Sequence, residues 1–244
     1  ERILREVEED ARKRFGDSID IDLLGKIRDG KVMADQGIIA GCSGGTYDNL
    51  AEAASILKGQ SVGNGYFTIS AYPQSVPVYM ATTRDGIAEE LLEAGVVIKP
   101  AFCGPCFGAG DVPSNNGLSI RHTTRNFPNR EGSKPGQGQI SLVALMDARS
   151  IAATAANGGV ITAATDVDYT NSHNPYKFDE KIYERRVFNG FGKEDASVEL
   201  RYGPNIKDWP KMYPMEKNML VELAAVIHDP VTTTDELIPS GETS

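Results

Sequence analysis

Apolar residues at the start of the chain recur at the spacing of one helical face. Within residues 1–15 they fall at Ile3, Leu4, Val7, Ala11 and Phe15. Charged residues occupy most of the positions between them, so the pattern predicts an amphipathic helix. Gly16 and Asp17 follow, and a glycine at this point is typical of a helix end.

Beyond this helix, short apolar runs alternate with longer segments of helical spacing. The runs that predict strands are residues 37–41, 66–71, 96–98, 118–121 and 142–145. The segments that predict helices are residues 47–58, 84–93 and 147–156, the first of them preceded by Thr46 as an N-cap. Strands that alternate with helices favour a parallel sheet covered on both faces, a three-layer α/β/α fold.

The alternation stops near residue 165, and this change indicates how the chain is divided. We expect residues 1–165 to form the α/β domain. Residues 166–199 are polar, aromatic and charged without regular spacing, and are interpreted as a long connector. Residues 200–244 contain Trp209, proline-rich turns and a strand-like run at 219–227. They are predicted to begin a second domain.

The composition argues against several classes of protein. The 244-residue chain has 40% hydrophobic and 24% charged residues, which is an ordinary globular mixture. No apolar run reaches the ~20 residues that a membrane-spanning helix needs. No signal peptide is evident, so a soluble, cytoplasmic protein is expected. The net charge of −9 argues against a nucleic-acid surface, which needs a basic patch.

Three cysteines are the candidates for chemistry. Their odd number, and the C-x-x-C spacing of Cys103 and Cys106, indicate metal or redox chemistry rather than structural disulfides. Cys42 directly follows the predicted strand at 37–41, and Cys103 follows the strand at 96–98. Because chemistry in parallel sheets lies in the loops after the strands, both positions suit a site.

Local sequence alone leaves four interpretations of these cysteines open. They are an iron–sulfur cluster, a thiol-redox pair, a zinc site and, for Cys42, a small buried core residue. A closed zinc site needs a fourth ligand, and His122 is a candidate for it. Glycines beside the cysteines suit a cluster, because they let the backbone approach it closely.

Several motifs in a fixed order carry a resemblance to a known family. Cys42 in a loop of small residues resembles the family's first cluster cysteine, and residues 103–106, C-G-P-C, resemble its C-G-x-C pair. Residues 125–130, R-N-F-P-N-R, resemble its N-R-N-F-x-G-R signature, and residues 233–235 resemble its T-T-D stretch. The chain is therefore similar to the aconitase family of hydratases, which includes the isopropylmalate isomerases, most clearly over residues 35–165.

The resemblance implies a cofactor and a reaction. Cys42, Cys103 and Cys106 would be the three thiolate ligands of a [4Fe–4S] cluster, with one iron left open to substrate. A hydro-lyase acting on a hydroxy-polycarboxylic acid is implied, with a small anionic carboxylic acid as its substrate. A cluster with an open iron is labile, so a cluster-free form is also expected in an isolated or air-exposed chain.

The resemblance also implies a domain type and further site residues. The fold would be that of the family's third domain, followed by the start of its C-terminal swivel-type domain. Arg125 and Arg130 match substrate arginines, and guanidinium groups bind carboxylates bidentately. Asp235 matches an active-site carboxylate, although an aspartate after threonines equally suits a helix N-cap. Arg121 and His122 are interpreted as structural.

The chain departs from the family pattern beside the proposed site. Gly41, Ser43 and Gly44 replace the usual neighbours of the first cysteine, and Thr124 and Asn129 replace two signature residues. A divergent hydratase is therefore expected rather than an aconitase acting on citrate. The family's catalytic serine and its histidine–carboxylate pairs are not found in this sequence. We therefore expect a piece of a longer enzyme, inactive alone, whose partners are the remaining domains.

Two functions of other classes stay open at this point. One is a non-catalytic iron–sulfur or regulatory module. The other is a thiol-redox protein that uses the C-x-x-C pair, which would leave Cys42 and the two signature arginines without a role.

Overall fold

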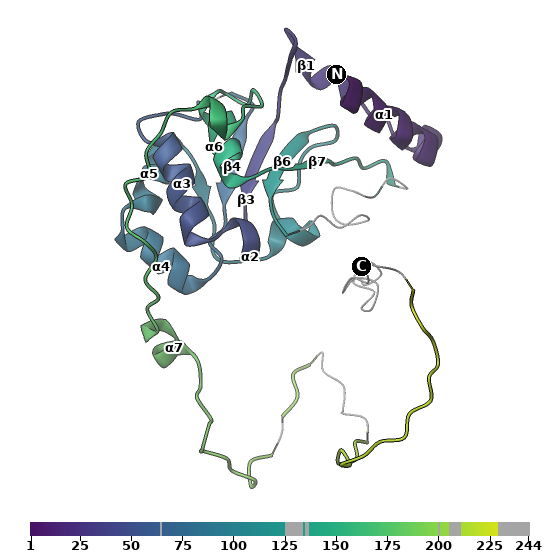
Figure 1. Cartoon of the computed structure of the whole chain (residues 1–244), viewed down its shortest axis with the longest axis vertical. Coiled ribbons are helices and arrows are strands. Elements are labelled where there is room, and N and C mark those ends of the chain that lie inside the picture. Colours follow the sequence, from purple (N-terminus) through teal and green to yellow (C-terminus); the bar gives the residue numbers. More distant parts are fainter. Residues whose placement is uncertain (64, 125–133, 135–136, 200, 205–210, 229–244) are drawn as a thin grey trace. The chain divides into compact units, whose positions relative to one another are not determined.

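The computed structural model describes residues 1–63, 65–124, 134, 137–199, 201–204 and 211–228. The chain forms two compact units that divide between Ile182 and Tyr183. The first unit holds the sheet and most of the helices (Figure 1).

A five-stranded parallel sheet forms the centre of the first unit. Its strands are β3 (Gln36–Ile39), β4 (Thr68–Ala71), β5 (Val97–Ile98), β6 (Leu118–His122) and β7 (Leu142–Leu145). They lie in the order β5-β4-β3-β6-β7, and all neighbours are parallel. The predicted α/β fold with a parallel sheet is confirmed. The strand order reverses between β3 and β6, which is where open α/β sheets bind ligands.

Four helices bury the apolar residues of the sheet. They are α3 (Tyr47–Leu57), α4 (Val76–Arg84), α5 (Ile87–Ala94) and α6 (Ala148–Ala156). Thr46 caps α3, since its hydroxyl accepts the Asn49 N–H at 3.3 Å, as the sequence indicated. The helix predicted at 84–93 is confirmed by α5, but it begins three residues later than predicted. Gly86, with φ of 80°, separates α4 from α5, and a left-handed residue cannot continue a helix.

The two faces of the sheet differ in polarity. Successive side chains of a strand point to opposite faces. Ile39, Ile69 and Ile120 belong to the main apolar cluster, together with residues of the helices. Ser119 and Arg121, at the alternate positions of β6, are buried polar residues. Arg121 meets the loop between β5 and β6, which contains the short helix η3 (Gly104–Phe107).

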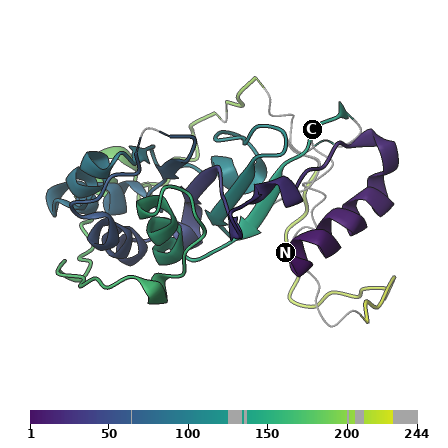
Figure 2. The same cartoon turned by 90° about the horizontal axis from the view of Figure 1, so that it is seen from above.

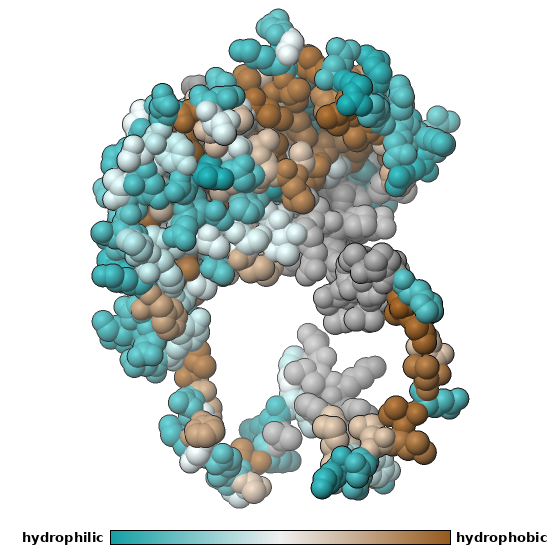
Figure 3. Space-filling view, in the orientation of Figure 1, coloured by the Kyte–Doolittle hydropathy of each residue, from teal (hydrophilic) through white to brown (hydrophobic). Residues whose placement is uncertain are grey.

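The N-terminal segment adds a smaller second cluster. It contains α1 (Arg2–Phe15), η1 (Gly16–Ser18), η2 (Leu24–Lys26) and the antiparallel pair β1 (Ile27–Arg28) and β2 (Lys31–Val32). The predicted amphipathic helix is confirmed by α1. Leu4 and Ala11 of this helix pack against a buried cluster that includes Ile21 and Leu142. In Figure 2, α1 lies beyond the β6–β7 side of the sheet, and Figure 3 shows apolar surface beside it.

The segment after α6 returns to the domain. It passes through η5 (Ala164–Asp166), and Val167, Tyr169 and Tyr176 pack against the main cluster. The Tyr169 hydroxyl donates to Glu52 Oε2 at 2.5 Å, and Asn171 Nδ2 donates to Glu52 Oε1 at 3.0 Å. These contacts attach the start of the predicted connector to α3.

The second unit has little regular structure in its described residues. These described residues contain the end of α7 (Lys181–Arg186) and no strand. The strand predicted at 219–227, which lies among them, is therefore wrong. The apolar residues of this run are exposed, and Leu220 is fully so. Among the described residues, no helix combines the length and the apolar character needed to cross a membrane.

Candidate functional site

The two central strands bring distant parts of the chain to one edge of the sheet. Cys42 lies in the short helix α2 (Gly41–Gly44), directly after β3, and Thr124 follows β6. Cys42 Sγ and Thr124 Oγ1 are 3.1 Å apart, and Ser43 Oγ lies 3.3 Å from the same hydroxyl. These contacts lie at the carboxyl ends of β3 and β6, where the strand order reverses.

Two glycines are required for the path of the Cys42 loop. Gly41 has φ of 73°, a left-handed conformation that other residues rarely adopt. A Cβ atom at Gly44 would lie 1.8 Å from the carbonyl oxygen of His122, so no side chain fits there.

Side chains from neighbouring elements fix this loop. Asn49 of α3 donates from Nδ2 to the carbonyl oxygens of Ser43 and Gly44, at 2.9 and 3.0 Å. Gln74, after β4, donates from Nε2 to the carbonyl oxygen of Cys42 at 3.2 Å. Sequence reasoning missed both residues. The only signal for Asn49 is its place three residues after the N-cap, and Gln74 had none.

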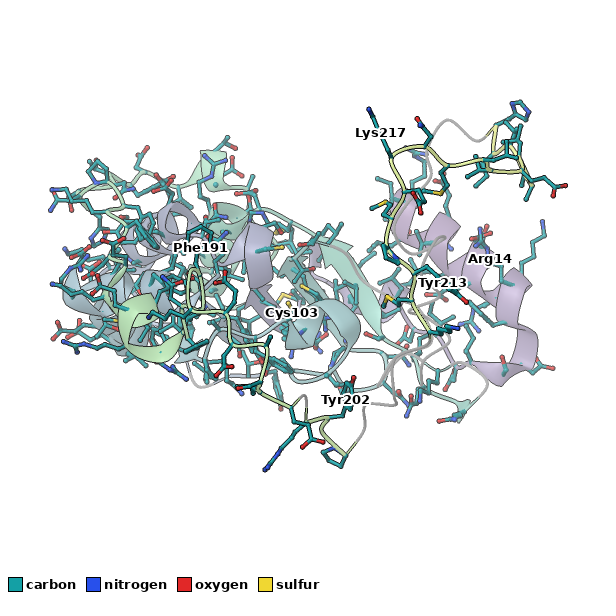
Figure 4. All side chains as sticks on the ribbon, turned by 90° about the horizontal axis from the view of Figure 1, so that it is seen from below. Arg14, Cys103, Phe191, Tyr202, Tyr213 and Lys217 are labelled. Atoms are coloured by element: carbon teal, nitrogen blue, oxygen red, sulfur yellow. The ribbon has the colours of Figure 1, made fainter. Side chains whose placement is uncertain are left out.

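The other two cysteines lie on the loop between β5 and β6. Cys103 is the N-cap residue of η3, and the N–H of Cys106 donates to the carbonyl oxygen of Cys103 at 2.9 Å. Cys103 is exposed, and Cys106 is 9% exposed. Other sulfur atoms, in yellow, gather beside the labelled Cys103 (Figure 4).

The structure brings the first cysteine loop against the C-x-x-C turn. A Cβ atom at Gly41 would lie 3.1 Å from Cys106 Sγ. Burial raises the pKa of the Cys106 thiol, and the nearby Cys103 and Cys42 sulfurs add to the rise. A hydrogen bond from the Thr124 backbone acts in the opposite direction on that pKa. All three cysteines are free thiols.

The donor set fits a cluster better than a single ion. Among the described residues, no three His, Cys, Asp or Glu side chains are grouped closely enough to hold one metal ion. A [4Fe–4S] cluster makes a different demand, since each thiolate binds a different iron and the sulfurs stand further apart. The chain offers three free cysteines on two glycine-rich loops, which approach each other at Gly41 and Cys106 Sγ.

His122 has a structural contact at the edge of this site. Its Nδ1 accepts the N–H of Ala148, at the first residue of α6, at 3.1 Å. Burial lowers the pKa of His122, which favours the neutral ring that this contact needs. The contact supports the structural role that the sequence indicated.

Arg121, a buried residue of β6, donates hydrogen bonds to the loop that contains the C-x-x-C turn. Its guanidinium donates to Ser119 Oγ at 2.8 Å, to the carbonyl oxygen of Pro105 at 3.0 Å and to that of Asp111 at 3.4 Å. The residue is 5% exposed. Its predicted role was structural, and these contacts are all within the domain.

Three predicted site residues, Arg125, Arg130 and Asp235, lie outside the described residues. The described residues therefore bring together the cysteine part of the predicted site. The described range that contains β6 ends at Thr124, one residue before the arginine signature.

Comparison with known proteins identifies a family for the chain. The model of the aconitase family (aconitate hydratase) matches residues 3–153. The chain is 31% identical over 137 residues to the 3-isopropylmalate dehydratase large subunit of Nitratidesulfovibrio vulgaris, covering 56% of this chain and 32% of that protein. It is 35% identical over 121 residues to large subunit 1 of the same enzyme from Methanopyrus kandleri, covering 49% and 29%.

A third relative extends the range of organisms. Large subunit 2 of the 3-isopropylmalate dehydratase of Pyrococcus furiosus is 38% identical over 108 residues, covering 44% of this chain and 28% of that protein. The chain spans about a third of the length of the curated relatives it matches. The family match covers both cysteine loops and more than half of the residues, so the chain belongs to the aconitase family.

Proposed function

We propose that this chain carries the cluster-binding domain of a [4Fe–4S]-dependent hydro-lyase. Its substrate class would be a hydroxy-polycarboxylic acid. The observation that carries the proposal is the convergence of the Cys42 loop and the C-x-x-C turn at the strand-order reversal, where Gly41 and Cys106 Sγ approach each other. The relatives support the reaction class, since the three named above are dehydratase large subunits.

Cys42, Cys103 and Cys106 are the proposed ligands. When bound, the cluster would supply an open iron as a Lewis acid for loss or addition of water. The protein residues would hold it in place. Thr124 and Gln74 orient Cys42, and the loop between β5 and β6 orients the other two cysteines.

Substrate recognition is proposed for the signature segment. Arg125 directly follows Thr124, whose hydroxyl contacts Cys42 Sγ. Guanidinium groups of Arg125 and Arg130 would bind the carboxylates of the substrate, because they pair with them bidentately and keep their charge. Asp235 is the proposed active-site carboxylate from the C-terminal part.

Further protein parts are needed for activity under this proposal. The relatives are named large subunits, and the chain matches about a third of each. We propose that residues 200–244 begin a swivel-type domain and that the exposed apolar run at 219–227 is covered there by the rest of that domain. The remaining domains, or a second subunit, would provide the catalytic base.

Anaerobic reconstitution of the 244-residue chain with iron and sulfide tests the proposal. We expect about four irons per chain, a broad visible absorbance and an EPR signal typical of a cluster that loses one iron on mild oxidation. Cys42→Ser, Cys103→Ser and Cys106→Ser should each abolish stable binding. Ser43→Ala is the matched control, since it changes a neighbour of Cys42 that is not a ligand.

Other outcomes separate the alternatives. A reversible dithiol couple of Cys103 and Cys106 without bound iron would support a thiol-redox protein and contradict the cluster. Robust hydratase activity of the isolated chain would contradict the need for further domains. A stable cluster together with no activity after the missing domains are supplied would favour a non-catalytic iron–sulfur module.

A further inference from the structure

A cationic side chain is buried beneath the C-x-x-C turn. Arg121 is 5% exposed, and its guanidinium donates to one hydroxyl and two carbonyl oxygens. Among the described residues, no carboxylate forms an ion pair with it. The hydroxyl and carbonyl oxygens that accept its hydrogen bonds carry no net charge, so they do not balance the cation, and an unbalanced buried charge is costly.

The candidate counter-charges are few. Burial lowers the pKa of Arg121, and nearby Asp111 and Cys106 oppose that effect. The Asp111 carboxylate already accepts the Tyr72 hydroxyl at 2.5 Å and lies 3.9 Å from Lys99 Nζ. The Asp111 carboxylate therefore interacts with Tyr72 and Lys99 as well, and is not a dedicated partner of Arg121. Pro105, whose carbonyl oxygen accepts from the Arg121 guanidinium, directly precedes Cys106, so the cation lies beside the cysteine turn.

The same side chain fixes the loop at two points. Pro105 lies inside the C-x-x-C turn, and Asp111 lies further along the same loop. Behind the guanidinium, Ser119 Oγ accepts from Arg121 Nε and donates to Gln36 Oε1 at 2.7 Å. A continuous chain of hydrogen bonds thus runs from β3 through β6 to the turn.

We propose that Arg121 is a positioning residue for the cluster, which fixes the C-x-x-C turn and supplies the positive charge that balances the thiolates. It touches no reacting atom. The balancing role rests on the proposed function, because a cluster with three thiolates carries negative charge there. The fixing of the turn can be tested without iron.

Removing this charge should change two properties of the bound cluster. A positive charge nearby stabilises the more negative, reduced state, so its loss should shift the reduction potential to more negative values. Loss of an outer-shell partner typically weakens metal binding about 10–100-fold, and iron release to a chelator should accelerate by a similar factor.

Three variants of the full chain separate charge from geometry. Arg121→Met removes both the charge and the hydrogen bonds, and should show the full change in potential and in iron release. Arg121→Lys keeps a charge but loses the planar fork, so its potential should stay nearer that of the parent while iron release accelerates. Ser119→Ala keeps Arg121 and its two carbonyl bonds, so its potential should equal that of the parent. Unchanged potential and iron release in Arg121→Met would overturn the proposal.

A second measurement uses the cluster-free chain. Alkylation rates are measured at each cysteine by mass spectrometry over a pH series. They are compared at the high-pH plateau, where the thiol is fully ionised and loss of the positive charge no longer changes the thiolate fraction. Loss of the hydrogen bonds to a charged group should raise the rate at buried Cys106 by about tenfold in Arg121→Met. The exposed Cys103 serves as the internal control, and its rate should not change. Equal protection of Cys106 in parent and variant would overturn the positioning role.

The cluster measurements and the alkylation rates together distinguish failure of the proposed function from failure of the Arg121 role. If the parent chain binds no cluster, the proposed function fails, and the alkylation rates still decide whether Arg121 fixes the turn. If the parent binds the cluster and Arg121→Met behaves like it, only the role of Arg121 fails. If Arg121→Met does not unfold cooperatively, Arg121→Lys and Ser119→Ala decide by the same readouts.

Discussion

Cys42 Sγ lies 3.1 Å from Thr124 Oγ1, although 82 positions separate the two residues in the chain. The contact follows from the sheet, in which Ile39 of β3 pairs in parallel with His122 of β6. Parallel neighbours deliver the residues that follow them to the same edge. The first cysteine and the start of the arginine signature, which are distant in sequence, are thereby joined at one place before any cofactor is considered.

The close approach at Gly44 gives the first prediction. Gly44→Ala would place a Cβ atom 1.8 Å from the His122 carbonyl oxygen, so the loop or the end of β6 must move. We expect a loss of at least about 1–3 kcal/mol in the free energy of unfolding, measured with urea. Gly65→Ala is the control, because a Cβ atom there meets nothing within 4 Å and the backbone is not left-handed. Equal stabilities of the two variants would contradict the close approach of Gly44 to β6.

Asn49 gives a prediction in which charge and shape act in opposite directions. Asn49→Asp keeps the shape but turns a donor to the Ser43 and Gly44 carbonyl oxygens into an acceptor facing them. An acidic residue in the first turn should otherwise favour a helix. We expect Asn49→Asp to lower the free energy of unfolding by about 1–3 kcal/mol, because the two carbonyl oxygens then face an anion. The loss should exceed that of Asn49→Ala. Asp48→Asn, at the exposed neighbour, is the control, and an Asp variant as stable as the parent would refute the contact.

Much of the fold could be predicted because local signals and tertiary structure agree. The apolar run at 37–41 became β3, and Thr46 began α3 as its side chain suggested. The helix predicted at 84–93 is α5, but its start was placed three residues too early because Gly86 was treated as an ordinary interior residue. The preceding helix α4 was missed, because Pro77 was not used as a start signal. The run at 219–227 shows that local pattern alone is not sufficient. An apolar run forms no strand when it has no neighbouring strand to pair with.

The candidate site could be predicted only in part. The cysteines were identified from their spacing and neighbours, which are local in sequence. The contact of Cys42 with Thr124 depends on β3 and β6 being adjacent, which spacing does not reveal. Arg121 looked like an ordinary polar residue of a strand, since the sequence does not show that the loop with Pro105 covers that face.

The division between the two units leads to a prediction about truncation. A chain that ends at Ile182 should unfold at the same urea concentration as the full chain, because the described residues beyond it are largely exposed. A chain that ends at residue 165 removes Tyr169 and Tyr176 from the main cluster. Its free energy of unfolding should fall by roughly 2–5 kcal/mol, because removal of large buried side chains typically costs this much. Equal stability of the two truncated chains would show that residues 166–182 are only a connector.

Glu52 links the segment after α6 to α3, and this link should depend on pH. The hydrogen bond from the Tyr169 hydroxyl, followed by that from Asn171, holds the pKa of Glu52 below its usual value of 4.5. A carboxylate with a lowered pKa contributes stability above its unfolded pKa and loses it as the pH falls through the folded value. The contribution of Glu52 should therefore be complete above about pH 4.5 and disappear below it.

Other carboxylates also titrate in this range, so the test compares variants rather than following the parent alone. Glu52→Gln removes the titrating group, and its stability deficit relative to the parent should be largest at neutral pH and shrink as the pH falls below about 4.5. Tyr169→Phe removes the main hydrogen bond from the other side, so it should show a deficit that shrinks over the same range. Urea unfolding at a series of pH values measures both differences. A deficit that stays constant from neutral pH to pH ~3 would mean that the Glu52–Tyr169 bond does not couple protonation to folding.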